Sequence, residues 1–442
     1  MAIQISDHFT YSKLLRFSLP SIIMMIFTSL YTIVDGLFVS NLAGQEAFTA
    51  LNLIWPAIGV IGSFGFMIGS GGTALISKTL GQRENRLASE YFSMLIAFEV
   101  ILGIVLAVFS IVFAVPIARL CGATEDLIPG CLQYGIPLFL ALPFFFLSTS
   151  FQTFLVAAGK PKLGLGISLL GGGLNMVLDY VFVGIFAMGA GGAAVATALN
   201  WVLTSIVPIW WFFRHKEAEF HLTAFKWRFK ALGQSCFNGM SEMVTNLSMN
   251  LVVLLYNLAL MEMAGSDGVV VYGILQYLTF LFSSVYLGYT MAVAPCVGYQ
   301  YGAANHAELK NLLRKSLILV GISNAVMVLV ADATAPLLSA VFVSYSDTLM
   351  DMTQAAIRIY SLGFLLAGFN GFASGFFTAL NNGFVSALLA FMRMFVFQVG
   401  SILILPSLFG LTGIWSANAV SEGLAFIMSA GSLILLRKKY GY

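Results

Sequence analysis

Charged residues are scarce in this chain of 442 residues: only 9% are Asp, Glu, Lys or Arg, whereas 59% are hydrophobic. A water-soluble protein of this length cannot cover its surface with so few charges, so the composition excludes a soluble globular fold and indicates a polytopic membrane protein. The formal net charge is +2, and the basic residues stand between apolar runs, so we expect no nucleic-acid partner.

Cysteine is also rare, and the four that occur (Cys121, Cys131, Cys236 and Cys296) have no metal-ligand spacing, so we expect them to be unpaired thiols. The chain has no glycine-rich loop ending in Gly-Lys-Ser or Gly-Lys-Thr, so we expect no ATP-driven step. Residues Met1 to Lys13 are polar and carry no small-residue cleavage site, which predicts that no signal peptide is removed.

Apolar runs are abundant, and a run of about 20 such residues is long enough to cross a bilayer. We predict an all-α fold with twelve transmembrane helices, at roughly 14–40, 47–77, 90–117, 128–157, 163–186, 190–213, 231–261, 268–300, 312–343, 352–380, 384–407 and 412–436. Between the sixth and seventh spans, Arg214 to Lys230 is the one candidate for a surface helix.

The basic residues fall almost entirely on one side of these spans. Eighteen of the 21 lysines and arginines lie before span one, between even and odd spans, after span twelve, or in the first turn of an odd span. Positive residues collect on the cytoplasmic side, so both termini are predicted to be cytoplasmic.

A shift of 221 residues brings the two halves of the chain into register. Gly81 then falls on Gly302, Gly192 falls on Gly413, and basic loops fall on basic loops. This pattern predicts two six-helix lobes related by a pseudo-two-fold axis along the membrane normal, with the cargo site between or inside the lobes. We therefore expect an N-lobe at 1–213, a cytoplasmic linker at 214–230 and a C-lobe at 231–442.

Two aspartates lie deep inside apolar spans of the N-lobe. Asp35 follows Tyr31 by one helical turn, and Asp179 follows Asn175 by the same spacing, after Gly171-Gly172-Gly173. A carboxylate in a span is costly against lipid, so these acids are expected to face protein, water or cargo. Small glycines allow a neighbouring helix to approach. Thr197 can add a hydroxyl group to the same cluster.

The C-lobe lacks this pattern, because Asp35 is matched by Tyr256 and Asp179 by Gly400 at the 221 shift. It offers instead Glu242, early in span seven, and Arg393, in span eleven. Either side chain is expected to line the cavity or to reach the membrane interface. Further intramembrane candidates are Glu99 and Glu422, and Asp332 near an outer helix end.

Several motifs resemble the multidrug and toxic compound extrusion family, MATE, and within it the MepA-like bacterial branch. They are Asp35-Gly36-Leu37-Phe38-Val39-Ser40, Gly69-Ser70-Gly71-Gly72-Thr73-Ala74-Leu75-Ile76-Ser77, Asn175-Met176-Val177-Leu178-Asp179-Tyr180, Gly191 to Thr197, and Asn238-Gly239-Met240-Ser241-Glu242-Met243. The likeness runs from about Leu14 to Arg437. One departure is Ser248, where other branches carry an acid in helix seven.

The resemblance implies a two-lobed exporter, not an enzyme, that ejects lipophilic cationic drugs or dyes in exchange for protons or sodium. In the family's N-lobe cation cluster the matching positions are Asp35, Asn175, Asp179 and Thr197, with Tyr31 beside them. We place cation coupling at those four residues and cargo binding at Tyr31, Asp35, Asp179, Glu242 and Arg393. No cofactor and no resident metal are expected; the coupling ion is H⁺, or Na⁺ held by the same oxygen atoms.

Two other functions stay open at this point. A flippase of the same fold superfamily would carry an anionic lipid-linked precursor, and its cavity should hold several cations. An intramembrane aspartyl protease would use Asp35 and Asp179 as general acid and base. Nothing in the sequence requires a protein partner beyond the bilayer, so we expect a monomer.

Overall fold

The computed structural model describes residues 3–38 and 44–442, and within these ranges it contains helices, turns and extended segments but no strand. The end of the predicted first span, residues 39 and 40, lies outside the described ranges.

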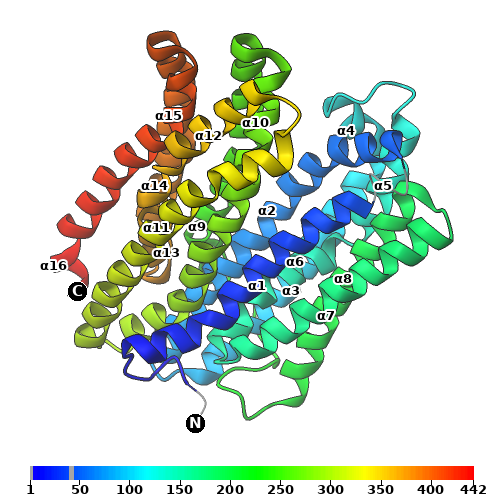
Figure 1. The fold of residues 1–442 in the computed structure, drawn as a ribbon. Coiled ribbons are helices and arrows are strands. Elements are labelled where there is room, and N and C mark those ends of the chain that lie inside the picture. Colours follow the sequence, from blue (N-terminus) through cyan, green and yellow to red (C-terminus); the bar gives the residue numbers. More distant parts are fainter. Residues whose placement is uncertain (1–2, 39–43) are drawn as a thin grey trace.

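The first half of the chain forms one set of helices (Figure 1). Its members are α1 (Tyr11–Phe38), α2 (Gln45–Gly81), α3 (Asn85–Val112), α4 (Ala114–Leu120), α5 (Ile128–Leu140), α6 (Leu142–Ala157), α7 (Pro161–Asp179), the π-helix η2 (Tyr180–Ile185) and α8 (Gly189–Arg214).

The second half repeats this plan. Its members are α9 (Phe229–Asn238), α10 (Met240–Gly302), α11 (His306–Val343), α12 (Asp347–Ser361), α13 (Phe364–Ala379), α14 (Gly383–Phe391), the π-helix η3 (Met392–Phe397), α15 (Gln398–Leu435) and α16 (Arg437–Tyr440).

The helices agree with the twelve predicted spans once two reversals and two bends are taken into account. In the described ranges, eight helices are long and apolar enough to cross a membrane. Two of these, α10 and the continuous α14–η3–α15 stretch, turn back at Gly265 and Gly410, where φ is positive, and Figure 1 shows both as hairpins. The bent pairs α5–α6 and α12–α13 supply one span each.

Proline accounts for the sharper of the two bends, which lies within the single span predicted at 128–157. The axes of α5 and α6 meet at 59° at Ala141, two residues before Pro143. Proline has no amide hydrogen to donate and its ring crowds the preceding turn, so the α-helix cannot continue through it undistorted.

The pseudo-symmetry is visible in the backbone as well as in the element order. Left-handed residues recur 221 positions apart at Gly44 and Gly265, and again at Gly189 and Gly410. Equivalent turns of the two halves therefore need the same unusual φ, which supports the repeat read from the sequence.

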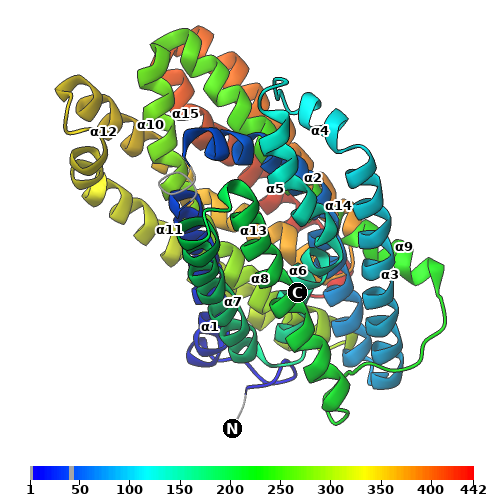
Figure 2. The same cartoon turned by 90° about the vertical axis from the view of Figure 1, so that its right-hand side faces the viewer.

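The predicted surface helix at Arg214 to Lys230 is wrong. Residues 215–228 are not helical; they run past α3 to α9 as an irregular strap (Figure 2). Hydroxyl groups of α3 accept from the backbone of this strap, Ser89 from His221 N at 3.2 Å and Ser93 from Thr223 N at 2.9 Å. Phe220 is fully buried against Phe92. Bonds to α3 satisfy the strap amides that a helix would have paired internally.

The two halves meet tightly at the end of the molecule that carries both termini. The side chain of Gln300 lies within hydrogen-bond distance of the carbonyl groups of Ile5 and Ser6, at the start of the first half. At this end α2 packs directly on α9 and α10.

Glycine makes this close packing possible. A Cβ atom on Gly71 would lie 2.0 Å from the carbonyl oxygen of Ser235, and one on Gly302 would lie 2.0 Å from that of Lys78. No residue with a side chain fits at such a separation, so the lobes touch backbone to backbone here. We call this contact the glycine seal.

Candidate functional site

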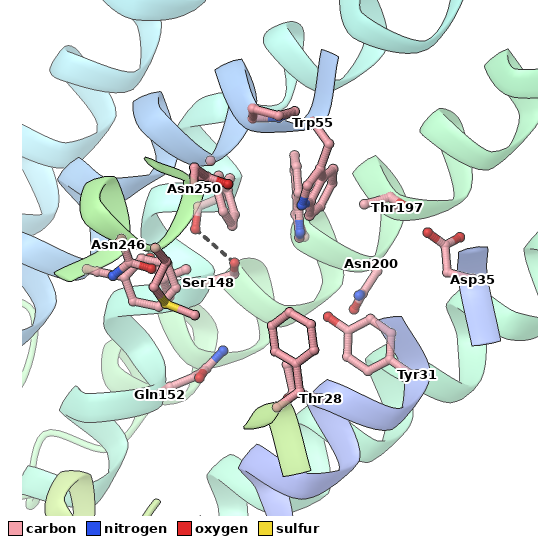
Figure 3. Close-up of a pocket in the computed structure, with 18 of the residues that line it drawn as sticks. Thr28, Tyr31, Asp35, Trp55, Ser148, Gln152, Thr197, Asn200, Asn246 and Asn250 are labelled. Carbon is pink, nitrogen blue, oxygen red and sulfur yellow. Dashed lines mark hydrogen bonds between the residues drawn. The ribbon is translucent and has the colours of Figure 1, made fainter. Parts of the chain in front are cut away.

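A cavity of about 1090 Å³ lies between the two halves of the chain. Its walls come from α1, α2, α6, α7 and α8 on one side and from α10 on the other (Figure 3). A cavity of this volume accommodates a drug-sized molecule. Its lining combines aromatic rings with neutral polar groups, and Asp35 is the one acid in the described lining, which contains no Lys, Arg or His.

Asp35 and Tyr31 face this cavity from α1, as their spacing predicted (Figure 3). The Tyr31 side chain lies beside Asn200 of α8 and interacts with Asp35. One oxygen of the Asp35 carboxyl group is buried and has no hydrogen-bond partner among the described residues.

Asp179 lies behind Asp35 rather than on the cavity wall. It is fully buried, and its carboxyl group is close enough to that of Asp35 for the two to interact electrostatically. Neither of its oxygens makes a hydrogen bond of ordinary length to another described residue. The two acids thus form a pair with one member at the cavity and one in the interior.

Asn175 and Thr197 complete the predicted cluster. The Asn175 amide donates to the Thr197 hydroxyl group at 3.5 Å, and Asn175 is 1% exposed. Thr197 also lines the cavity, whereas Asn175 and Asp179 do not. The structure brings Tyr31, Asp35, Asn175, Asp179 and Thr197 together, although their roles stay predictions.

The glycine run before Asn175 works largely as expected. A Cβ atom on Gly171 would clash with Asn200 Oδ1 at 2.3 Å, and one on Gly172 would lie 2.6 Å from the Phe27 ring. Gly173 has open space around it. The first two glycines therefore bring α7 against α8 and α1.

A change of helix type marks the position of Asp179. The α-helix α7 ends at that residue and continues as the π-helix Tyr180–Ile185. A π-helical turn leaves some backbone groups without their α-helical partners, and such turns occur frequently at functional sites.

Sequence reasoning missed two neighbours of the acid pair. Tyr134 of α5 is fully buried, interacts electrostatically with both aspartates, and its hydroxyl group has no partner among the described residues. Asn200 lies against Tyr31 and Gly171. No local pattern marks either residue, because each is a single polar group in an apolar run.

The structure places Glu242 and Arg393 away from the described cavity lining. Arg393 binds Glu422 through two nitrogens, with Nη2 to Oε1 at 2.7 Å and Nε to Oε1 at 2.9 Å, and Asn370 donates to the same carboxylate at 2.7 Å. Glu242 interacts with Arg393 from α10. The guanidinium group is committed to this C-lobe ion pair, which explains how a cation persists in an apolar span.

The other acid candidates have separate positions. Glu99 is fully buried in the first half, where Ser150 donates to it and its second oxygen has no described partner. Asp332 pairs with Arg358 at 3.1 Å in a half-exposed position. Neither lines the described cavity.

The C-lobe counterpart of the acid pair is neutral. Tyr256, which matches Asp35 at the 221 shift, accepts from Gln398 Nε2 at 3.0 Å, and Ser421 donates to the same Gln398 side chain. Tyr256 also stacks on Tyr272 with ring centroids 4.5 Å apart. Where the first half has the acid pair, the second half has a hydrogen-bonded network of neutral polar side chains.

Within the described ranges no three His, Cys, Asp or Glu side chains converge into a metal site, and the four cysteines are free thiols. The oxygen atoms available at the acid pair are two carboxyl groups, an amide and a hydroxyl group. Such hard oxygen donors fit a proton or an alkali cation better than a transition metal.

The fold and the cavity define a two-lobed membrane transporter. The MatE family model matches the chain twice, over residues 20–181 and 242–403, so the internal repeat is a repeat of one family unit. The chain belongs to this family, whose multidrug transporters are not enzymes.

The chain is similar to the "Multidrug export protein MepA" of Staphylococcus aureus (strain MSSA476), with 23% identity over 97% of this chain and 94% of that protein. The protein of the same name from Staphylococcus haemolyticus (strain JCSC1435) is 25% identical over 94% of this chain and 92% of its own length. A structure described as the outward-facing conformation of a multidrug resistance MATE family transporter superimposes with a TM-score of 0.90, covering 98% of each chain at 24% identity.

Proposed function

We propose that this protein is a secondary active multidrug exporter that exchanges lipophilic cationic compounds for protons, or for sodium, by alternating access. The observation that carries the proposal is the cavity between the lobes, in which Asp35 is the one described charge and Asp179 stands directly behind it. The names of the similar proteins, which refer to multidrug export, agree with it.

The mechanism follows from competition for one pair of carboxyl groups. A cation in the cavity can neutralise Asp35, and so can a proton or a sodium ion shared with Asp179, Asn175 and Thr197. Two ionised carboxylates side by side are costly in a low-dielectric interior, so one of them keeps a proton and the pair offers a single negative charge, which one cation compensates. Binding of the cargo cation therefore releases the proton or sodium ion, and binding of the ion releases the cargo. The exchange becomes directional when the lobes open alternately to each side of the membrane.

The glycine seal agrees with this cycle. It joins the two lobes at the end that carries the termini, which the distribution of basic residues predicts to be cytoplasmic, and we infer that it closes the cavity there. We assign the described conformation to the outward-facing half of the cycle, in a chain that acts as a monomer in a bacterial inner membrane.

A flippase for an anionic precursor is the less favoured alternative, because the described cavity lining offers no Lys, Arg or His to bind phosphate groups. A protease function is excluded by membership of a transporter family.

Ethidium efflux from proteoliposomes tests the proposal. Purified protein is reconstituted with ethidium and a nucleic-acid reporter inside, and a proton gradient or a sodium gradient is imposed separately. We expect a proton gradient alone to drive efflux. A strict sodium requirement would instead make Asp35, Asn175, Asp179 and Thr197 sodium ligands. Absence of ethidium movement with either gradient would overturn the proposal.

A further inference from the structure

The wall of the cavity opposite Asp35 is built from carboxamides. Asn246, Asn250 and Asn257 of α10 stand at positions i, i+4 and i+11, so they share one face of the helix, and all three line the cavity. Gln276, from the returning part of α10, lines it too. Figure 3 shows Asn246 and Asn250 on one side of the cavity and Asp35 and Tyr31 on the other.

Three of these carboxamides are not used by the protein itself. Asn246 donates to the carbonyl group of Glu242, one turn earlier, at 2.8 Å. Asn250, Asn257 and Gln276 make no hydrogen bond to any other residue in the described part of the chain. Asn250 is also among the exposed residues of α10.

A free carboxamide inside a membrane span requires an explanation. Polar residues in such helices usually bond to a neighbouring helix, which stabilises helix packing. These residues have no such described partner, and facing lipid would leave donors and acceptors unsatisfied. Their groups are therefore available to water when the cavity is empty and to cargo when it is filled.

The two walls differ in the chemistry that they offer. The wall from the first half provides the one carboxylate of the described lining together with carboxamides such as Asn52 and Gln152, whereas the polar groups of the α10 wall are all neutral. Aromatic rings such as Tyr31 and Trp201 lie between the polar groups.

We propose that Asn250 and Asn257 form a second recognition subsite, the carboxamide subsite, that selects cargo by its neutral end. The cargo that fits is an aromatic molecule with one cationic centre, directed to Asp35, and with hydroxyl or carbonyl groups at its opposite end. This inference rests on the proposed export function, since it names the cargo class for the same cavity.

Two cargoes that differ at the neutral end separate the contribution of the carboxamide subsite to transport from the contribution of Asp35. Daunorubicin carries one ammonium group together with hydroxyl and carbonyl groups, whereas tetraphenylphosphonium carries one charge and no hydrogen-bonding group. Efflux kinetics of both are measured in proteoliposomes for the wild type and for Asn250→Leu, Asn257→Leu and the double variant. Leucine keeps the branching of asparagine at Cγ, at a larger side-chain volume, and removes its hydrogen-bonding groups.

We expect each substitution to lower the ratio of kcat/KM for daunorubicin to that for tetraphenylphosphonium by about fivefold, the factor that one hydrogen bond of typical strength supplies. The double variant should lower it on the order of twentyfold. Asn250→Gln should restore most of the ratio, because it retains a carboxamide.

The matched control is Asn52→Leu. Asn52 lines the same cavity, but its amide already donates to the Phe48 carbonyl group at 2.9 Å, so the cargo ratio should change less than twofold.

The outcomes are distinguishable. Equal effects of the α10 substitutions on both cargoes would overturn the carboxamide subsite while leaving the export function intact. A wild-type protein that moves neither cargo would overturn the export function itself. Continued transport of tetraphenylphosphonium by the leucine variants shows that they are folded.

Discussion

Asp179 contributes to the site by position rather than by contact with the cavity. It is completely buried, its nearest charged neighbour is Asp35, and the described residues leave both of its oxygens without an ordinary hydrogen bond. A buried carboxylate without partners is expensive, so the group either holds a proton or shares a cation with Asp35. Exchange between these states is the property that an antiporter needs.

Replacing Asp179 by asparagine keeps the shape of the side chain and removes its ability to ionise. We expect Asp179→Asn to reduce gradient-driven ethidium efflux at least tenfold while the protein elutes as a folded species in size-exclusion chromatography. Glu99→Gln is the matched control, because it makes the same chemical change at a buried acid that does not line the cavity. Efflux near the wild-type level from Asp179→Asn would remove the acid pair from the mechanism.

The acid pair could be predicted from sequence because Asn175 and Asp179 share a helix face inside an apolar run. Arg393 and Glu422 were each recognisable as intramembrane charges, but their pairing was not. It depends on how α15 packs beside the α14–η3 helix, and no local pattern encodes that contact. The same limit applies to Tyr134, which approaches the acids from α5.

The segment before α1, which we call the latch, joins the two halves of the chain. The backbone amide of Phe9 donates to Glu308 Oε1 at 2.9 Å, the His8 ring contacts Oε2 of the same carboxylate at 2.5 Å, and Lys315 donates to the Phe9 carbonyl group at 2.6 Å. Phe9 is fully buried, and Cys296 of α10 lies completely buried in the same apolar cluster.

Removing the latch carboxylate should favour opening of this end. Glu308→Ala deletes two charge-assisted contacts, each worth about 1.5–3 kcal/mol, so the open population should rise at least tenfold. The readout is maleimide labelling of Cys296 in a chain whose other three cysteines are serine. Glu90→Ala is the control, because in the described part of the chain Glu90 pairs with Arg86 of its own helix and with Arg228 at the end of the linker strap. An unchanged labelling rate for Glu308→Ala would exclude the latch.

Helix positions were largely predictable because runs of apolar residues long enough to span a bilayer are a strong signal. The conformation of the linker was not predictable, because a polar stretch between spans has no hydrophobic periodicity that distinguishes a surface helix from a strap bonded to α3. The bend at Ala141 could have been inferred from Pro143, whereas the one at Gly363 depends on packing.

At the scale of the whole molecule, the described state is defined by which end of the cavity is closed. The glycine seal and the latch both lie at the end that carries the termini. The repeat itself could be predicted from the sequence. Which end of the cavity is closed could not, because one sequence supports both conformations of a transporter and their free energies differ by only a few kcal/mol.

A reversible cross-link through the seal tests whether this end must open. A Cβ atom at Gly298 would lie 3.1 Å from that of Ser77, close to the separation of about 3.5–4.5 Å found in disulfides. In a chain without its native cysteines, oxidised Ser77→Cys/Gly298→Cys should lose at least 90% of ethidium efflux and regain it on reduction. Each single variant is the control. Full efflux by the oxidised, cross-linked protein would contradict alternating access.

The carboxamide wall of α10 also bears on how the range of cargo can change over generations. One base change converts an asparagine codon into a codon for aspartate or lysine. Asn250 and Asn257 already lie on the cavity wall, and their side chains make no hydrogen bond within the described ranges, so a single nucleotide change can place a new positive or negative charge opposite Asp35. Drug selection acting on this gene therefore has a one-step route from monocationic cargo to dicationic or zwitterionic cargo.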